Sequence, residues 1–451
     1  MPKTHSSWRR AFSVYCQPKV LAMIFLGFSA GLPFILVSST LSAWLADINI
    51  SLAIIGYFSL VGAAYSVKVI WAPIIDKAPL PLLTRCLGKR RSWMLLSQLG
   101  IALGLWSISR LTIADQLEQA ALLAVIVAFC SATQDIVIDA YRIEAIAQEY
   151  QGAMAAAYIF GYRVSLLAAG AGALYIAEYF DWSTAYQTMA YLMAAGIVTT
   201  FLITEPHHNA NLATKQSNHQ AGQSGKQSYF TGLAAWFFDA VVGPFVEFFQ
   251  RNGRHGITIL ALISLYKMSD IAMGVMANPF YLDLGFSKKE IADVTKLFGF
   301  FMTIFGTSLG GVLVVRYGLM RPLLLGAVLV ALTNLLFAAL AIIPPNLWSL
   351  AAVVSADNLS GGIASAVFIA YLSSLTNANY TATQYALFSS LMTLPAKLIG
   401  GFSGQIVAGV GYGGFFVYAA VIGIPAIVLS LMIRNSPPSF RAQVETASTA
   451  D

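Results

Sequence analysis

The stretch Val20–Ala46 reads VLAMIFLGFSAGLPFILVSSTLSAWLA and contains 27 residues without a charge. The hydrocarbon core of a bilayer is about 30 Å thick, so roughly 20 apolar residues span it as a helix. Longer charge-free runs of 35, 39 and 36 residues occupy Pro322–Ala356, Asn358–Ala396 and Leu398–Ile433. Each of these longer runs has room for more than one helix, so Val20–Ala46 is one of many expected membrane spans.

The composition agrees with a membrane protein. Hydrophobic residues make up 58% of the 451 residues and charged residues only 10%, whereas soluble domains carry about 25% charged residues. This excludes an ordinary soluble enzyme, a disordered chain and a nucleic-acid-binding module. The three cysteines, Cys16, Cys86 and Cys130, form neither a paired framework nor a CxxC motif, so we expect no disulfide and no metal site.

Turn-forming residues divide the long runs at Pro344-Pro345-Asn346, at Thr376–Asn379 and at Gly409-Val410-Gly411. With these breaks, the sequence predicts an all-α polytopic membrane protein with twelve transmembrane helices. The expected spans are 20–45, 53–76, 92–110, 118–144, 152–177, 183–204, 256–281, 288–315, 321–343, 347–375, 382–408 and 413–433.

The spans divide the chain into two groups of six. We expect an N-terminal six-helix bundle at 1–204, a cytoplasmic linker at 205–254, a C-terminal six-helix bundle at 255–435 and a polar cytoplasmic tail at 436–451. Within the linker, Trp236–Phe249 is aromatic and amphipathic, which is typical of a helix that lies at the membrane interface. A short additional span is the alternative, although 14 residues are few for crossing a bilayer.

Lysine and arginine predict the orientation. Eighteen of them fall on the side of the two termini and the linker, and only Arg110, Lys288 and Lys289 fall on the other side. Positive residues stay cytoplasmic, so both termini are expected inside. This distribution explains the net charge of +6 without a nucleic-acid partner. Arg9-Arg10 faintly resembles a twin-arginine signal, but the apolar run that follows is too long for a cleaved signal peptide.

The two groups of spans contain a weak internal repeat. Asp47 and Trp44 correspond to Asp283 and Phe280 at an offset of 236 residues. A second set at an offset of 230 residues pairs Gly170 with Gly400, Trp182 with Tyr412 and Tyr186 with Phe416. The near-equal offsets favour a parallel duplication, hence two pseudo-symmetric six-helix bundles. That is the architecture of major facilitator transporters, in which the substrate binds at mid-membrane between the halves.

Nine charged residues are candidates for charges deep inside the expected spans. A charge at the bilayer centre costs roughly 2.5–3.5 kcal/mol on insertion scales, so each needs a partner, water or a function. Depth predicts a buried cluster of Lys68, Asp135, Asp139 and Arg163 in the first half. A second group nearer the periplasm contains Lys267, Asp270, Lys296, Asp357 and Lys397; Lys296 and Lys397 complete the expected set of buried ion-pair residues.

Asp135 and Asp139 are spaced i, i+4 and therefore project from one helix face. A carboxylate that exchanges basic partners between two conformations could load and release a proton, because those partners shift its pKa. We therefore expect proton coupling at Asp135 or Asp139, with Asp270 and Asp357 as further candidates. The alternative is that these groups form static ion pairs between helices.

A cavity for a large polar solute needs polar, aromatic and basic side chains. Trp and Tyr can stack on sugar faces while their NH or OH groups form hydrogen bonds. Trp44 has the alternative role of a tryptophan at the membrane interface. The glycine-rich stretches, such as Gly27-(x)3-Gly31, are expected to allow close helix packing. The candidate substrate-binding residues are Trp44, Lys68, Gln134, Tyr141, Arg163, Tyr266, Lys267, Asn278 and Asn358.

Motifs in nearly every span, over about 20–430, resemble the AmpG-type muropeptide permeases of the major facilitator superfamily. The most specific is Phe129–Ala140, FCSATQDIVIDA. Its Gln134-Asp135-Ile136 alone would also suit the related acetyl-CoA transporters. The other similar stretches are Gly27–Pro33, Tyr57–Gly62, Lys68–Pro73, Gly161–Arg163, Leu265–Asp270, Asn358–Gly362 and Ala382–Leu387.

A second motif resembles the loop between spans two and three of major facilitator transporters. It consists of Asp76-Lys77 and Gly88-Lys89-Arg90-Arg91, here separated by Ala78–Leu87. In the family this loop has a gating role, and the insertion puts that role in doubt for this chain. The expected gating residues are Asp76, Lys77, Lys89, Arg90 and Arg91.

The resemblance implies a monomeric permease of the inner membrane of a Gram-negative bacterium, surrounded by lipid. It would import N-acetylglucosaminyl-1,6-anhydro-N-acetylmuramic acid, with or without its stem peptide, by proton symport and without a cofactor. Such import feeds cell-wall recycling and, in some hosts, β-lactamase induction and antibiotic resistance. The alternatives are a permease for acetyl-CoA or a sugar phosphate, which would need more cavity arginines, and a membrane enzyme, for which the spans offer no histidine. We expect no enzyme activity.

Overall fold

The computed structural model describes residues 13–50, 54, 58, 61, 64–206, 242–377 and 380–434. Within these ranges every regular element is a helix and no strand is present. Eight of the described helices are long and apolar enough to cross a membrane. The structure thus confirms the all-α prediction, while the total of twelve spans stays a prediction.

The N-terminal bundle contains the helices up to α13. The first expected span is broken after Leu36 into α2 and α3, and the fifth continues through a π-helical turn, η5, into α11. Its helices are α2 (Pro18–Leu36), α3 (Ser39–Asp47), α5 (Ala64–Val67), η3 (Lys68–Ile70), α6 (Ala72–Lys77), α7 (Leu83–Leu87), α8 (Lys89–Ile108), α9 (Leu117–Ala145), α10 (Gln151–Leu167), η5 (Ala168–Gly172), α11 (Ala173–Tyr179), α12 (Trp182–Leu192) and α13 (Ala194–Leu202).

The C-terminal bundle follows a short helix, α16 (Gly243–Asn252). Helix α17 ends at Tyr266, and α18 begins at Met268, so the helical conformation is interrupted at Lys267. The helices of this bundle are α17 (His255–Tyr266), α18 (Met268–Asp283), α19 (Lys288–Ile291), η7 (Ala292–Phe298), α20 (Gly299–Tyr317), α21 (Met320–Leu340), α22 (Leu347–Ser374), α23 (Thr381–Gly401) and α24 (Ser403–Arg434).

The predicted breaks in the long apolar runs are confirmed. Helix α22 begins after Asn346, whose side chain accepts a hydrogen bond from the backbone of Trp348 and so caps the helix. The next break separates α22 from α23. Helix α24 is kinked at Gly411, where φ is 70°, a conformation that favours glycine.

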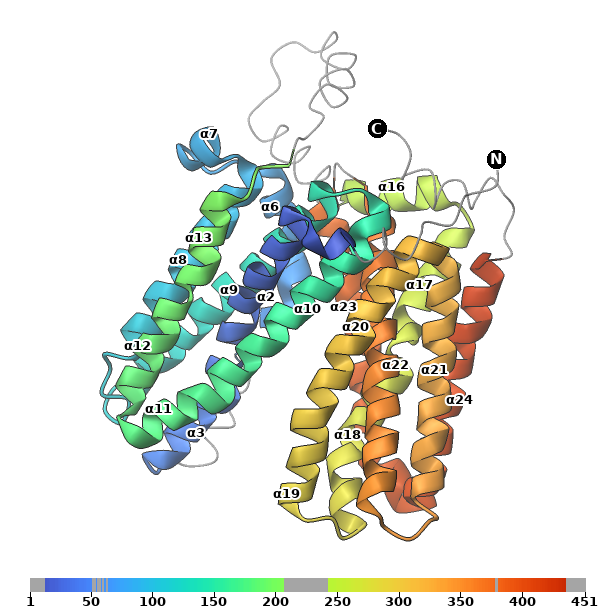
Figure 1. Ribbon diagram of the computed structural model, residues 1–451. Helices are drawn as coiled ribbons and strands as arrows, with labels where there is room; N and C mark the ends of the chain where they lie inside the picture. The colour runs from blue at the N-terminus through green and yellow to red at the C-terminus, as the bar shows by residue number, and fades with distance from the viewer. Residues whose placement is uncertain are drawn as a thin grey trace.

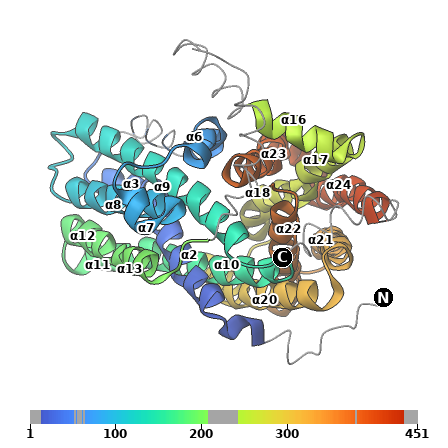
Figure 2. The same ribbon diagram turned by 90° about the horizontal axis from the view of Figure 1, so that it is seen from above.

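The two bundles lie side by side and meet along two seams (Figure 2). In one seam α10 packs against α20 and α22, and in the other α6, η3 and α9 pack against α23. Figure 1 shows the helix ends of the two bundles close together where α6 and α16 lie, and far apart where α3 and α19 lie. We call the first of these the joined end; it includes α6, α16 and the start of α23.

The internal repeat is supported by equivalent contacts in the two bundles. The indole nitrogen of Trp182 donates to Asp47 at 2.8 Å, and the hydroxyl of Tyr412 donates to Asp283 at 2.8 Å. Trp44 stacks on Trp182 with ring centroids 5.8 Å apart, and its counterpart Phe280 lies 5.1 Å from Tyr412. Residues matched by sequence offset therefore make matching contacts, as duplication predicts.

Glycines allow the closest helix contacts, as expected. A Cβ atom at Gly27 would overlap the carbonyl oxygen of Tyr158, and one at Gly161 would overlap the carbonyl of Ile24. Both contacts join α2 to α10, so small residues on both helices bring the two backbones together. Gly404 differs, because nothing lies within 4 Å of its Cβ position.

Helix α16 is the described part of the expected interfacial helix; residues 236–241 lie outside the described residues. With ten residues it is about 15 Å long, too short to span a bilayer. Its Phe248 is buried and lies 5.4 Å from Phe388 of α23, measured between ring centroids. The helix therefore packs on the C-terminal bundle at the joined end.

Candidate functional site between the two bundles

One face of α9 directs charged side chains at the seam with α23. Asp135 lies 4.0 Å from the ammonium group of Lys68 in η3, and their side chains are only 17% and 12% exposed. Asp139 is paired with Arg142 at 3.3 Å. The spacing 135, 139, 142 keeps all three on one helix face. The structure thus brings Lys68 and Asp135 together, and it gives Asp139 a partner that the sequence analysis did not assign.

Arg163 on α10 also faces the other bundle. Gly152 on the same helix lies against Gly311 of α20, and Arg163 follows it by eleven residues, which is about three helical turns. Both residues therefore lie on one face, about 16 Å apart along the axis. Asp270 of the C-terminal bundle acts electrostatically on Arg163, and Arg163 as a whole residue is exposed. Within the described ranges Arg163 has no hydrogen-bond or ion-pair partner.

The C-terminal bundle contributes a matching charged group. The ammonium of Lys267, at the break between α17 and α18, donates to Asp270 at 2.6 Å and to the hydroxyl of Ser365 at 2.8 Å. Asp357 on α22 accepts from Thr333 at 3.3 Å, and both Asp270 and Lys267 act on it electrostatically. Opposite charges thus lie near the seam in both bundles.

The expected four-residue cluster is only partly formed. Arg163 is not paired with Asp135 or Asp139; the charge of the C-terminal bundle that acts on it is Asp270 in α18. The side chains of Lys296, Lys397 and Asn278 lie outside the described residues, so their predicted roles stay predictions.

Three predicted substrate-binding residues lie in bundle interiors in this conformation, and their role in binding a solute stays a prediction. Trp44 is 6% exposed and is covered by Trp182 and Tyr186. Tyr141 is fully buried in the N-terminal bundle. Tyr266 stacks on Phe368 with ring centroids 4.2 Å apart, while its hydroxyl donates to the backbone of Leu323. These aromatic side chains hold helices together and are not open to a solute.

Two predicted polar residues also bind neighbouring helices. Gln134 is fully buried, and its amide donates to Ser29 of α2 at 2.9 Å. Asn358 is partly buried; it accepts from Thr303 of α20 at 2.8 Å and donates to its own helix at the carbonyl of Val354. Both therefore act first as helix-packing groups within one bundle.

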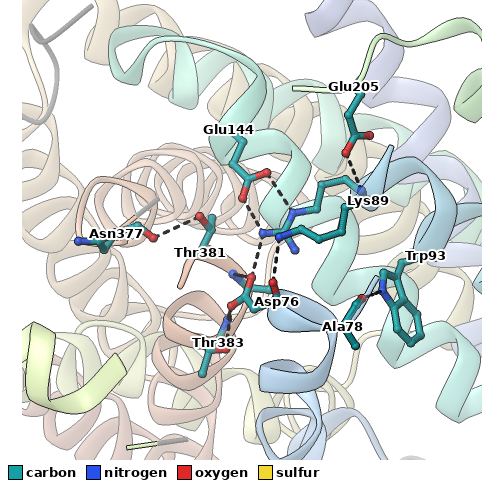
Figure 3. Close-up of polar contacts among 11 residues, drawn as sticks. Asp76, Ala78, Lys89, Trp93, Glu144, Glu205, Asn377, Thr381 and Thr383 are labelled. Atoms are coloured by element: carbon teal, nitrogen blue, oxygen red, sulfur yellow. Dashed lines mark hydrogen bonds and ion pairs between the residues drawn. The ribbon is translucent and has the colours of Figure 1, made fainter. Parts of the chain in front are cut away.

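The joined end is held by one buried carboxylate, Asp76 at the end of α6 (Figure 3). It accepts hydrogen bonds from the backbone of Ala382 at 3.1 Å and from the backbone and hydroxyl of Thr383 at 2.6 and 2.7 Å. These donors begin α23, where helical N–H groups have no partner within the helix. A carboxylate from one bundle thus caps a helix of the other, in a favourable position relative to the helix dipole.

A basic group neutralises Asp76 within its own bundle. Arg90 is 1% exposed and donates to Asp76 at 2.8 Å and to both oxygens of Glu144 at 3.0 and 2.6 Å. Glu205 in turn caps α8 by accepting from the backbone of Arg90 and Arg91. The pKa of Lys89 is lowered, mainly by burial and next by the positive charge of Arg90. The nearby carboxylates oppose this effect because they favour the charged ammonium.

The insertion Ala78–Leu87, part of which forms α7, does not separate the two parts of the loop motif. Lys89 still donates to the backbone of Asp76 at 2.9 Å. Lys77 lies 4.7 Å from the ring centroid of Tyr380 in the C-terminal bundle. Arg91 differs from the other expected gating residues, because it donates to the carbonyls of Thr200 and Phe201 at the end of α13. It therefore fixes its own bundle.

A second link between the bundles involves Arg142. This fully buried guanidinium donates to Ser373 of α22 at 2.8 Å and to Gln151 at 3.2 Å. It also lies 5.1 Å from the ring centroid of Tyr385 of α23. Arg142 was not among the site residues expected from the sequence, although its spacing of i+3 from Asp139 was a signal for pairing.

Together these contacts join the bundles at one end. The hydrogen bonds and cation–π contacts described between them come from Asp76, Lys77 and Arg142, and from Tyr15, whose hydroxyl donates to the backbone of Ser308. Toward the other end the helices diverge, and Arg163 and the Lys267–Asp270 pair lie along that part of the seam. Such an arrangement can expose charged groups to one side of a membrane while it closes the other.

The similarity to known proteins agrees with this geometry. The profile of the Major Facilitator Superfamily matches residues 23–396. The anhydromuropeptide permease of Escherichia coli (strain K12) is 35% identical over 425 residues, which cover 94% of this chain and 81% of the relative. The putative transporter AmpG 4 of Rickettsia felis is 32% identical over 424 residues, which cover 94% of this chain and 98% of the relative.

A solved structure shows the same fold. The proton:xylose symporter XylE, bound to 6-bromo-6-deoxy-D-glucose, superposes with a TM-score of 0.67 at 12% identity, covering 95% of this chain and 96% of that one. At this identity the likeness concerns the fold alone. The relatives named here are transporters and permeases, and the apolar helices suit a multi-pass membrane protein. The chain therefore belongs to the major facilitator superfamily and, within it, to the family of AmpG-type muropeptide permeases.

Proposed function

We propose that the protein imports anhydro-muropeptides across a bacterial inner membrane, driven by protons. The observation that carries this proposal is the 35% identity to an anhydromuropeptide permease along 94% of the chain. The solute would be N-acetylglucosaminyl-1,6-anhydro-N-acetylmuramic acid, with or without a stem peptide. The joined end would be cytoplasmic, since most of the positive residues outside the spans lie on that side.

The charges along the seam suit this solute. An anhydro-muropeptide is anionic, because it carries either the lactyl carboxylate of its sugar or the carboxylates of its peptide. Arg163 faces the C-terminal bundle and is an exposed residue, and its guanidinium has no hydrogen-bond or ion-pair partner among the described residues. A guanidinium can bind a carboxylate through two parallel hydrogen bonds. Arg163 is therefore the first expected contact for the solute, with Lys267 and Lys68 as further cations.

The buried carboxylates support proton coupling. Asp135 is paired with Lys68 only at 4.0 Å, which is longer than a charge-assisted hydrogen bond. A loose pair of this kind can exchange its partner for a proton at small cost when the bundles move. Asp357, with Thr333 as its hydrogen-bond donor, would have a similar role in the C-terminal bundle.

The conformation supports alternating access. In this conformer the joined end is held by Asp76 and Arg142; with that end in the cytoplasm, the charged groups would face the periplasm. Import then requires these contacts to break while the other ends of the bundles approach. The protein would do this as a monomer, without a cofactor, and the proton would be the coupling ion.

Transport into membrane vesicles tests the proposal. Purified protein is reconstituted with radiolabelled anhydro-disaccharide outside, with and without an inward proton gradient. We expect gradient-dependent accumulation that unlabelled anhydro-muropeptide inhibits. Accumulation that is the same with and without the gradient would exclude proton coupling. Inhibition by acetyl-CoA or a sugar phosphate, but not by the muropeptide, would show that the protein carries one of those solutes.

A further inference from the structure

Helix α16 is fastened to the turn between α22 and α23 by one carboxylate. Glu247 accepts a hydrogen bond from the side chain of Asn377 at 2.8 Å and another from the side chain of Gln384 at 2.6 Å. The same amide nitrogen of Gln384 also donates to the backbone of Pro244 at 3.0 Å. Gln384 is only 1% exposed, so its polar atoms depend on these partners.

Two further contacts fix the same helix. Arg251 donates to the backbone carbonyl of Leu375, just past the end of α22, at 2.6 Å, and it pairs with Glu247 at 2.9 Å. Phe248 lies between Glu247 and Arg251 in the sequence; its side chain is buried and packs on Phe388 of α23. The helix therefore contacts the end of α22 and the start of α23 at once.

Gln384 also lies in the helix start that Asp76 holds from the other bundle. Gln384 directly follows Ala382 and Thr383, whose N–H groups donate to Asp76. The side-chain oxygen of Gln384 accepts from the backbone of Asn377 at 2.7 Å and so links the segment after α22 to the start of α23. Glu247 and Asp76 thus act on neighbouring residues of one helix start, from two different parts of the chain.

We propose that α16 stabilises closure of the joined end. Glu247 is a positioning residue: it holds Gln384 so that the start of α23 docks on Asp76. Glu247 lies outside both bundles and makes no contact with Asp76; it acts through the turn. The inference rests on the proposed alternating access, because the bundles must separate at the joined end. It does not depend on which solute is carried.

The contact chemistry makes the inference testable by exchange of the two side chains. In Glu247→Gln an amide donor replaces one carboxylate oxygen and meets the donor of Gln384 or Asn377. In Gln384→Glu two carboxylates face each other. When both substitutions are combined, the new amide on α16 can donate to the new carboxylate on α23 and accept from Asn377. The pairing is then regained with its direction reversed, although the bond to Pro244 is lost.

The readout is the separation of the bundles at the joined end. Spin labels are placed on Cys86, which is exposed in α7, and on Arg321→Cys, which is exposed at the start of α21, with Cys16→Ser and Cys130→Ala. Pulsed electron double resonance on the reconstituted full chain gives the populations at short and long distance. Glu149→Gln is the matched control, because Glu149 is an exposed glutamate at the same end.

We expect Glu247→Gln and Gln384→Glu each to raise the ratio of separated to joined molecules about tenfold, the size of one charge-assisted hydrogen bond. Glu149→Gln should leave the ratio of separated to joined molecules unchanged. The double variant should bring this ratio most of the way back to that of the wild type. The inference is overturned if the two single variants match the control, or if the double variant is no better than the singles. Gln384→Glu tests the contact from the α23 side should Glu247→Gln not fold.

These outcomes are separate from those of the transport assay. A protein that carries another solute would still show the changed distance populations. If the protein imports muropeptide but the distance populations do not change in Glu247→Gln, the proposed function stands and this inference is wrong.

Discussion

Replacing Asp76 with asparagine tests how strongly one residue holds the joined end. The aspartate accepts four hydrogen bonds, three from Ala382 and Thr383 and one from Arg90. An asparagine has nearly the same shape but only one acceptor oxygen. If that oxygen takes the place next to Arg90, the amide NH2 faces the N–H of Thr383, donor against donor.

The size of the effect follows from these bonds. Hydrogen bonds to a charged group contribute about 1.5–3 kcal/mol each. In the separated state Asp76 regains water, so only part of the three bonds between the bundles counts. A net loss of about 2–4 kcal/mol corresponds to a roughly 30- to 700-fold shift toward separated bundles, since about 1.4 kcal/mol is tenfold.

The label pair at Cys86 and Arg321→Cys measures this shift directly. We expect the long-distance population to become dominant in Asp76→Asn, and apparent affinity for solute added from the outside to fall with it, because fewer molecules present the outward-facing site. Asp115→Asn is the control; Asp115 is exposed and lies near the start of α9, at the opposite end.

One result would refute the reasoning. If Asp76→Asn keeps the short distance as fully as Asp115→Asn does, the cap on α23 contributes nothing to closure, and packing alone holds the joined end. A shift smaller than about threefold would already contradict the range expected from these hydrogen bonds.

The remaining predictions concern coupling, solute binding and packing. In Asp135→Asn, accumulation should lose its dependence on the proton gradient while exchange of solute across the membrane continues; gradient dependence equal to wild type would exclude this carboxylate. Arg163→Gln should raise the KM for muropeptide about 10- to 100-fold through loss of a charged hydrogen bond, with Arg163→Lys in between, and an unchanged KM would place the solute elsewhere. Gly27→Ala should lower the thermal unfolding midpoint, because its methyl group would overlap the carbonyl of Tyr158 at a cost of about 1–3 kcal/mol; Gly404→Ala, with open space around it, should not, and equal midpoints would contradict the packing argument.

Much of the helical layout could be predicted because it follows from local chemistry. Charge-free runs longer than a bilayer is thick must fold back, and they do so at Asn346 and at Gly411, where residue type alone favours a break. The spacing of Asp135 and Asp139 placed both on one face in the same way. The pairing of Trp182 with Asp47 and Tyr412 with Asp283 extends this to the repeat, since matched residues met matched environments.

The directions of single polar and aromatic side chains could not be predicted in the same way. In a soluble helix the apolar stripe marks the buried face, but in a membrane bundle the lipid face and the bundle core are both apolar. The sequence around Tyr141 and Tyr266 therefore gave no sign of which face points to the seam, and both are buried in their bundles. Arg163 faces the other bundle without the carboxylate partners that depth alone had suggested for it.

Contacts between the bundles could not be predicted from the sequence because their partners are far apart in the chain. Asp76 and Thr383 are 307 residues apart, and each alone has an ordinary explanation, as a loop charge and a helix-starting threonine. Only the arrangement of α6 against α23 shows that one caps the other. Arg142 is similar, because its nearest sequence signal is Asp139, whereas its hydroxyl acceptor Ser373 lies in the other bundle.

The start of α23 shows why the joined end acts as a unit. Thr383, Gln384 and Tyr385 are consecutive and all buried, and successive helical residues point about 100° apart. They consequently reach three different parts of the chain: Asp76 in α6, Glu247 in α16 and Arg142 in α9. Separating the bundles breaks the first and third contacts together, whereas the second stays within the moving part. Closure therefore depends on the two carboxylates in different ways, because Asp76 supplies the bond that breaks and Glu247 keeps the helix start in the shape that lets it re-form.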